Sequence, residues 1–196
     1  AQAIYNPFVG NYIMDSFTTE VGAEVYFRKN GFISMIGATN GKLNQGANAP
    51  SATSPSVMAK LGYDKQFNTD LRFRITGSIY NSAYSARTYL YGGDRAGSRY
   101  YFVMEPTTAT SSANYSSGLV NPGLTNKLTA IMINPFVKYK GFEFFGLFET
   151  VSGRKFAETD RRNFTQLGAD LLYRFGKNEN LYVAGRYNSV SGELDA

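Results

Sequence analysis

The chain lacks three residue types that carry much of protein chemistry, because its 196 residues include no Cys, no His and no Trp. Disulfides, zinc sites and every His-based catalytic dyad or triad are therefore excluded. The absence of Cys is compatible with an oxidising compartment. No spacing of the remaining polar residues indicates a metal or phosphate site. We therefore expect neither a cofactor nor an enzymatic activity.

Strong charge runs and long apolar runs are also missing. The net charge of +5 is spread along the chain, which does not favour a nucleic-acid partner. No apolar run approaches the ~18 residues of a membrane helix. The first ten residues, AQAIYNPFVG, have neither the basic start nor the apolar core of a signal peptide. An exported form of this chain is therefore expected to be mature or truncated.

What the chain does have is 15 Tyr, 15 Phe and 20 Gly, a mixture that suits many strands joined by polar turns. Apolar and polar residues alternate with a period of two, most clearly between Asn163 and Ser191. This pattern predicts eight strands, at about 18–28, 32–44, 56–65, 70–84, 127–139, 142–154, 163–175 and 181–193.

The lengths of the strands and of their connections favour a membrane protein. Globular strands usually have about 5–6 residues, whereas a tilted membrane-spanning strand needs ~9–11. Tight connections are expected at Lys29 to Gly31, Lys65 to Thr69, Lys140 to Gly141 and Gly176 to Asn180. Longer ones are expected at Gln45 to Pro55, Ser85 to Asn126 and Lys155 to Arg162. Short turns at one end and long loops at the other are typical of outer-membrane barrels.

The segment from Ser85 to Asn126 is too long for an ordinary connection. Its first part, RTYLYGGDRAGSRYYFV, predicts a protruding hairpin that turns at Gly92 and Gly93. Its second part is polar and has no periodicity. We interpret residues 85–126 as a long external loop or protruding hairpin. A disordered loop, a folded surface cap and an inward constriction are the alternatives.

Aromatic residues cluster beside all four tight connections. A ring of aromatic side chains at one rim is what a membrane interface favours, although ordinary cross-strand packing is the alternative explanation. The residues concerned are Phe27, Phe32, Tyr63, Phe67, Phe73, Tyr139, Phe142, Phe144, Tyr173, Phe175 and Tyr182.

Sorting each strand by face separates an apolar set from a charged set. A two-residue turn at Lys140 and Gly141 would pair Tyr139 with Phe142, and Lys138 with Glu143, which keeps each set on its own face. The strand 32–44 is ambiguous in register. Pro135 cannot donate to the ladder and predicts a bulge.

The hairpin that ends the predicted sheet gives the sharpest expectations. If Phe175 opposes Leu181, then Asp170 opposes Arg186, and the two form an ion pair. Leu171 and Val183 fall in the apolar register near mid-strand and are expected to contact lipid.

The charged set is expected to face a water-filled lumen. It contains seven basic and seven acidic residues, so it gives no net preference for anions. The predicted pore-lining residues are Glu20, Glu24, Arg28, Lys60, Asp64, Asp70, Arg72, Arg74, Lys138, Glu143, Glu149, Asp170, Arg174 and Arg186.

The predicted fold is therefore all-β, an antiparallel up-and-down transmembrane β-barrel. The first and last strands both reach the long-loop end, whereas a complete bacterial barrel normally has both termini on the short-turn side. The chain also ends in LDA, without a terminal aromatic residue. We expect residues 1–196 to form a single, incomplete barrel domain that belongs to a larger barrel.

Two segments also resemble a known family. INPFVKYKGFEFFGLFETVSGR and FTQLGADLLYRFGKNENLYVAGRYNSVSGE, within residues 131–193, are similar to outer-membrane porins of the phosphate-selective porin O and P family. The resemblance implies a roughly 16-stranded porin, often trimeric, that passes small anions.

The function expected from the sequence is a passive channel for small polar solutes or ions in the outer membrane of a Gram-negative bacterium. Its partners would be outer-membrane lipid, small polar or anionic solutes, and a homo-trimer or larger membrane complex. The main alternative is a non-transport barrel that serves as an anchor or accessory subunit, with its function in residues 85–126. A soluble β-sandwich lectin and an enzyme within a barrel are weaker alternatives.

Overall fold

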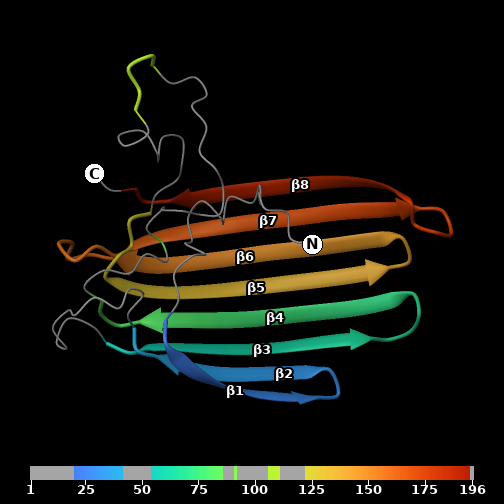
Figure 1. The fold of residues 1–196 in the computed structure, drawn as a ribbon, viewed down its shortest axis with the longest axis horizontal. Helices are drawn as coiled ribbons and strands as arrows, with labels where there is room; N and C mark the ends of the chain where they lie inside the picture. The colour runs from blue at the N-terminus through green and yellow to red at the C-terminus, as the bar shows by residue number, and fades with distance from the viewer. Residues whose placement is uncertain (1–19, 42–53, 86–90, 92–105, 111–121, 195–196) are drawn as a thin grey trace.

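The structure, a computed structural model, describes residues 20–41, 54–85, 91, 106–110 and 122–194. These residues form one eight-stranded antiparallel sheet in which every strand pairs with the next strand along the chain (Figure 1). The strands are β1 (Gly22–Lys29), β2 (Phe32–Thr39), β3 (Ser56–Gln66), β4 (Leu71–Ser82), β5 (Lys127–Tyr139), β6 (Phe142–Arg154), β7 (Arg162–Phe175) and β8 (Leu181–Gly192). The predicted all-β, up-and-down order of eight strands is confirmed.

The sheet is open, because β1 and β8 form its two edges and do not pair with each other in the described part of the chain. This agrees with the expectation that eight strands do not close on themselves. The connections segregate as predicted. The tight turns lie at one end of the sheet, on the right in Figure 1, and the longer connections lie at the opposite end. We call these the tight-turn end and the long-loop end.

The tight turns contain residues with positive φ. Lys29 pairs with Phe32, which leaves a two-residue loop of Asn30 and Gly31. Both residues have positive φ, 52° and 89°, as a type I′ hairpin turn requires. Lys140 adopts a φ of 51° in the turn between β5 and β6. These turns fix the register of the hairpins that they join.

The register separates the sheet into an apolar face and a polar face. Tyr139 pairs with Phe142 and Lys138 with Glu143, as predicted from the turn between them. The ambiguous strand 32–44 is resolved, because Phe32 pairs with Tyr63 and its alternate residues follow on the apolar face. Large apolar side chains of this face are exposed along most strands, from Val25 and Ile36 through Ile79 and Phe148 to Leu171 and Val183.

The predicted bulge at Pro135 is wrong. Ile133 pairs with Phe148 and Phe136 pairs with Phe145, so the register between β5 and β6 is the same on both sides of the proline. Gly146 lies across from it, and a Cβ on Gly146 would stand 2.8 Å from the Pro135 ring. The missing side chain makes room for the ring, so the strand needs no additional residue.

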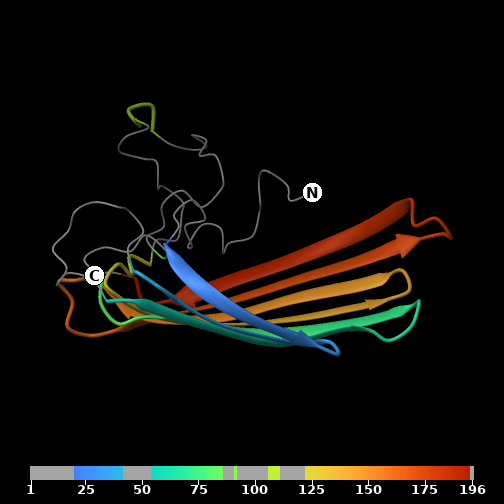
Figure 2. The same ribbon diagram turned by 60° about the horizontal axis from the view of Figure 1, so that its bottom comes forward.

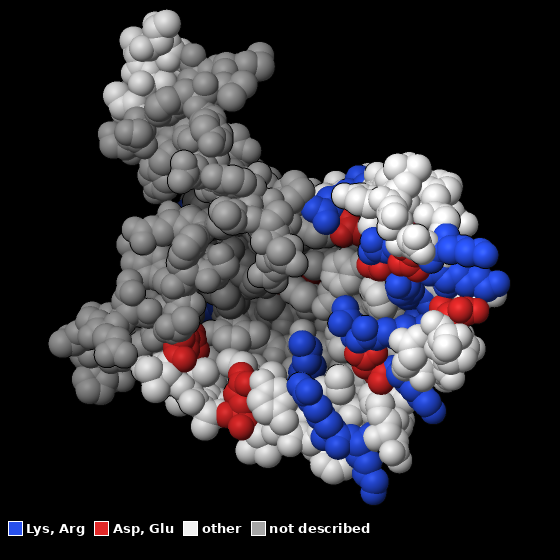
Figure 3. All heavy atoms as spheres, turned by 45° about the vertical axis from the view of Figure 1, so that its right-hand side comes forward, with Lys and Arg blue, Asp and Glu red and all other residues white. Residues whose placement is uncertain are grey.

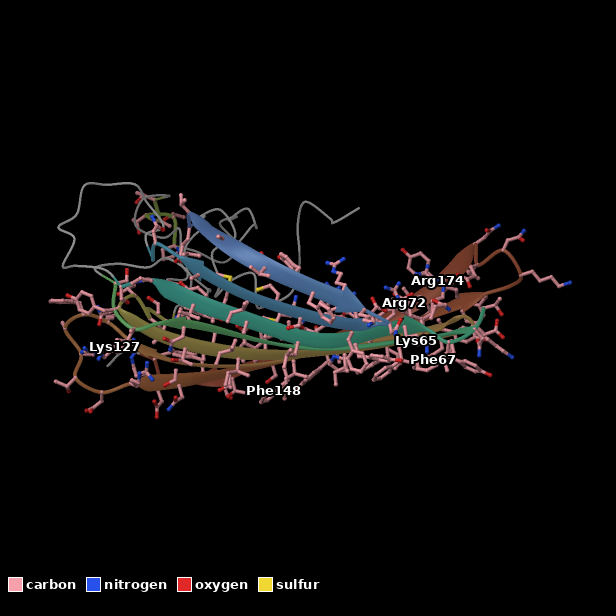
Figure 4. All side chains as sticks on the ribbon, turned by 90° about the horizontal axis from the view of Figure 1, so that it is seen from below. Lys65, Phe67, Arg72, Lys127, Phe148 and Arg174 are labelled. Atoms are coloured by element: carbon pink, nitrogen blue, oxygen red, sulfur yellow. The ribbon has the colours of Figure 1, made fainter. Side chains whose placement is uncertain are left out.

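The sheet is curved into a trough (Figure 2). Phe148 is on the apolar face and points outward from the convex side of the sheet (Figure 4). Arg72 and Arg174 lie on the concave side, near the tight-turn end. The polar face therefore lines the concave side of the sheet. This arrangement places the charged side chains of neighbouring strands close enough to interact.

Aromatic rings form a band on the apolar face at the tight-turn end. Phe32 packs edge-to-face on Tyr63 with ring centroids 5.0 Å apart, and Tyr173 on Phe175 at 4.7 Å. Tyr182 is the exception among the predicted girdle residues that lie in strands, because it pairs with Arg174 on the polar face. Ring packing across strands accounts for part of the pattern that the sequence shows.

The buried core lies on the polar face at the long-loop end. Leu128, Val151 and Phe164 are almost fully buried there, together with Tyr91 and Leu124 from the connection between β4 and β5. Tyr91 and Leu124 also pair with each other in an isolated β-bridge. The described residues include no helix long and apolar enough to cross a membrane.

Candidate functional site on the polar face

The structure gathers the predicted pore-lining residues on one face. Twelve of the fourteen lie in strands, and the register places all twelve on the polar face. The other two are Glu20 and Asp70. Glu20 precedes β1, but its side chain reaches the polar face of β2 and β4. Asp70 is exposed in the turn between β3 and β4, beyond the end of the strand wall.

At the tight-turn end, the charges form ion pairs between neighbouring strands. Arg72 holds Asp64 with two hydrogen bonds of 3.0 and 2.8 Å. The guanidinium of Arg186 holds Asp170 with two hydrogen bonds of 2.5 and 2.8 Å, which confirms the predicted pair. Two parallel bonds fix the orientation of both partners.

Further contacts lie between these two pairs, and together they form a charged band. Arg174 lies 3.3 Å from Glu143 and 3.6 Å from Glu179, and Glu179 lies 3.6 Å from Lys138. The guanidinium of Arg74 stacks over the ring of Phe136, 5.2 Å from its centroid. Partly exposed ion pairs each contribute only ~0–1 kcal/mol to stability. We therefore interpret the band as a source of fixed charge along the face rather than as a stabilising network.

Toward the long-loop end, the predicted pore-lining carboxylates Glu20 and Glu149 contact hydroxyl groups instead of cations. The Tyr80 hydroxyl donates to Glu20 at 2.8 Å and also lies 2.8 Å from the Ser56 hydroxyl. The Tyr91 hydroxyl donates to Glu149, whose side chain is nearly buried. Burial, reinforced by the neighbouring Glu149, raises the pKa of Tyr91 well above its usual value, so this hydroxyl remains a donor.

Tyr80, Tyr91 and Leu124 are functional-site residues that sequence reasoning missed. Tyr91 and Glu149 are 58 positions apart, and no periodicity relates the loop to the sheet. Of the alternatives for residues 85–126, inward packing is observed for Tyr91 and Leu124. The predicted hairpin turn at Gly92 and Gly93 lies outside the described residues.

Arg162 is a further missed residue, and it connects segments at the rim of the long-loop end. Its guanidinium donates to Glu158 at 3.0 Å and to the carbonyl oxygens of Pro122 and Glu193 at 2.7 and 2.9 Å. Partial burial raises the pKa of Glu158, but hydrogen bonds from the Lys155 backbone and from Arg162 lower it by more, so the net shift is downward. The contacts tie the start of β7 to the segment before β5 and to the end of β8.

The chemistry of the polar face is set by carboxylates, cations and hydroxyl groups. The described residues contain no group of three Asp or Glu side chains placed to hold a metal ion. What they form is a curved wall with charges on its concave side and exposed apolar side chains on its convex side. Such a wall can separate an aqueous space from an apolar one.

The fold defines an all-β protein built on one open, eight-stranded antiparallel sheet. No protein-family model matches the chain, and neither a curated protein nor a solved structure matches it significantly. No family assignment therefore supports the resemblance of residues 131–193 to phosphate-selective porins. A functional proposal has to rest on the geometry of the two faces.

Proposed function

We propose that this chain forms part of the wall of a bacterial outer-membrane channel, a water-filled barrel that passes small polar solutes or ions. The single observation that carries the proposal is the separation of the two faces. Leu171 and Val183 are 51% and 64% exposed on the convex side. Contact of these apolar side chains with water is unfavourable, whereas contact with lipid is not. The concave side carries the ion-paired charges.

Closure of such a barrel requires more than these eight strands. The outer backbone groups of β1 and β8 face no strand within the described sheet. In lipid, unpaired backbone groups are costly, so a membrane-spanning sheet must close on itself. The proposal therefore includes further strands between β8 and β1. Selection of solutes would be passive, by size and by the field of the fixed charges.

The experiment uses the absence of native Cys to probe the two faces one residue at a time. Ser78→Cys places a thiol on the polar face, and Ile79→Cys places one on the apolar face of the same strand. The full-length protein is reconstituted in planar bilayers and treated with a charged, membrane-impermeant thiol reagent. We expect both variants to conduct. The reagent should reduce the conductance of Ser78→Cys and leave that of Ile79→Cys unchanged.

Two results would contradict the channel. Equal labelling of both thiols in the absence of detergent would indicate a water-soluble sheet. Membrane insertion without conductance would favour the second candidate function, a non-transport barrel that anchors or assists a larger membrane assembly. The buried cluster around Leu128 and Phe164 favours that candidate, because it fills part of the concave side at the long-loop end.

A further inference from the structure

A concave pocket of about 620 Å³ lies on the polar face toward the long-loop end. Its described walls come from β1 to β6 and from Tyr91. Three carboxylates line it, those of Glu20, Glu24 and Glu149, and Lys60 is the only basic side chain among its described lining residues. Three negative charges and one positive charge leave the lining with a net charge of −2.

The carboxylates of the pocket differ in their partners from those at the tight-turn end. Each accepts a hydrogen bond from a hydroxyl group, Glu20 from Tyr80 and Glu149 from Tyr91, while Glu24 accepts one from Tyr26. Among the described residues, none of the three lies within 4.0 Å of a Lys or Arg nitrogen. These carboxylates therefore retain the capacity to pair with an external cation.

A buried amide beside Glu149 has no partner. Gln166 lies directly across from Glu149 in the next strand and on the same face. Its side chain is 1% exposed, yet neither its amide oxygen nor its amide nitrogen makes a hydrogen bond. Buried polar groups are rarely left unsatisfied in native proteins. Gln166 is not among the lining residues of the pocket, so its amide offers unused hydrogen-bonding capacity next to Glu149 rather than inside the pocket.

The other side chains of the pocket are apolar and polarizable. All three methionines in the described residues, Met35, Met58 and Met132, line it. Gly37 lies between Glu24 and Met58. A Cβ on Gly37 would stand 2.9 Å from the Cγ of Glu24 and 3.1 Å from the Cγ of Met58, so the glycine keeps this space open. Methionine adapts its shape to varied ligands, and tyrosine faces attract cations.

The three methionines of the lining cannot all reach one soft metal ion. Lys60 and Ser78 separate Met35 from Met132 along one row of cross-strand pairs, so the two methionines stand three strands apart. At ~4.8 Å per strand, that spacing is roughly 14 Å, too far for the two thioethers to share an ion. The combination of dispersed carboxylates, thioethers and tyrosine rings instead suits an organic cation.

We propose that this pocket is a binding subsite for an alkylammonium cation, a positively charged nitrogen that carries apolar substituents. The charge is placed among Glu20, Glu24 and Glu149, and the substituents contact the methionines and the rings of Tyr80 and Tyr91. The inference rests on the proposed function for its route of access, because the solute would reach the pocket through the lumen. It also adds a solute class, organic cations, to that function.

The test measures binding separately from conductance. The full-length protein in non-ionic detergent is titrated calorimetrically with tetraethylammonium chloride, and with NaCl as the control salt. We expect saturable binding of tetraethylammonium and none of Na⁺. Glu20→Gln and Glu149→Gln should each weaken binding about fivefold, which corresponds to about 1 kcal/mol for one screened charge pair.

Glu179→Gln is the matched control, because it removes the same charge from the turn between β7 and β8, outside the pocket. It should leave the affinity for tetraethylammonium unchanged. The circular dichroism spectrum should be the same for every variant as for the unmodified protein. Absence of saturable binding, or unchanged affinity in the Glu20→Gln/Glu149→Gln double variant, would overturn the proposal. Conductance without tetraethylammonium binding overturns the pocket alone, whereas binding without conductance overturns the channel and retains the pocket.

Discussion

At the scale of single residues, the polar face contains two kinds of carboxylate. Those near the tight turns, such as Asp64 and Asp170, are held by arginines on the neighbouring strand. Those near the long loops, such as Glu20 and Glu149, are held by tyrosine hydroxyls. The first kind contributes little net charge to its surroundings, because its partner cancels it. The second kind has no Lys or Arg nitrogen within 4.0 Å among the described residues, so no neighbouring cation cancels its charge.

The pair of Asp170 and Arg186 allows a direct test of this distinction. Arg186→Ala should leave Asp170 as an unpaired negative charge and shift the ion selectivity of the proposed channel towards cations. The cost to stability should be small, roughly 0.2–1 kcal/mol, because the pair is partly exposed. The measurement is the reversal potential across a bilayer under a salt gradient.

The double variant Asp170→Arg/Arg186→Asp is the control for this prediction. It exchanges the two charges and restores a pair in the same register, so its selectivity should return to that of the unmodified protein. If Arg186→Ala has the same reversal potential as the unmodified channel, the pair has no part in selectivity.

Residue contacts were predictable from the sequence where a short turn links the partners. Asp170 and Arg186 are 16 positions apart, and counting back from the turn between them places one opposite the other. The contact of Tyr80 with Glu20 spans 60 positions with unrelated connections between them. Alternation assigns a face to each residue within a strand, but it says nothing about which side chains from a loop will cover that face.

At the scale of elements, the tight-turn ends of strands were predicted better than their long-loop ends. The first strand was expected at 18–28, and its described part runs from Gly22 to Lys29. The second was expected to extend to residue 44 but ends at Thr39. Asn30 and Gly31 fix one end of both strands through their backbone conformations. At the other end, Gly41 has a φ of 69° two residues after β2, but it does not face a partner strand in a short hairpin, because the next described residue is Ser54.

The period-two pattern also did not predict that apolar residues of the concave face are buried. Residues 127–133 read KLTAIMI, with apolar side chains at both odd and even positions. Such a run does not show which face is buried. The structure places Leu128 and Ala130 in the core cluster and exposes Ile131 and Ile133 on the convex side. The register set by the turn at Lys140 and Gly141 assigns the two sets to opposite faces, and the contact with Tyr91 and Leu124 shows which of the two is buried.

The convex side gives a prediction about individual strands. Val183→Arg or Leu171→Arg should reduce the free energy of folding into a bilayer by about 2–4 kcal/mol, if the position lies near the bilayer midplane. The reason is that both side chains are exposed on the apolar face, where the proposed channel meets lipid. The measurement is a denaturant titration of the protein folded into lipid vesicles.

Ala184→Arg is the matched control for the strand β8. It places the same side chain one residue further along, on the polar face, and should cost much less. A cost for Val183→Arg no larger than that for Ala184→Arg would mean that the convex side does not contact lipid.

At the scale of the whole molecule, the fourteen predicted pore-lining charges balance in number but not in position. Six basic and four acidic residues lie toward the tight-turn end, which leaves +2 there. Lys60 stands against three acidic residues toward the long-loop end, which leaves −2. Figure 3 shows Lys and Arg side chains gathered around the hollow near the tight turns. These fourteen residues therefore form a charge gradient along the strands of the polar face.

A channel lined by such a gradient should conduct unequally in the two directions of applied voltage. Mobile ions accumulate in the pore under one polarity and are depleted under the other, because each end attracts ions of opposite sign. We expect a curved current–voltage relation in 0.1 M KCl, where charges act over about 10 Å, and a nearly linear one in 1 M KCl, where they act over about 3 Å.

The variants that test the gradient act on its acidic end. Glu20→Gln/Glu24→Gln removes two of the three carboxylates there and should reduce the curvature in 0.1 M KCl. Asp64→Asn, at the tight-turn end, makes the basic end more positive and should increase it. A linear relation for the unmodified channel at low salt would contradict the gradient, even if conductance itself were present. If neither variant changes the curvature of the current–voltage relation, residues other than those of the polar face cause it.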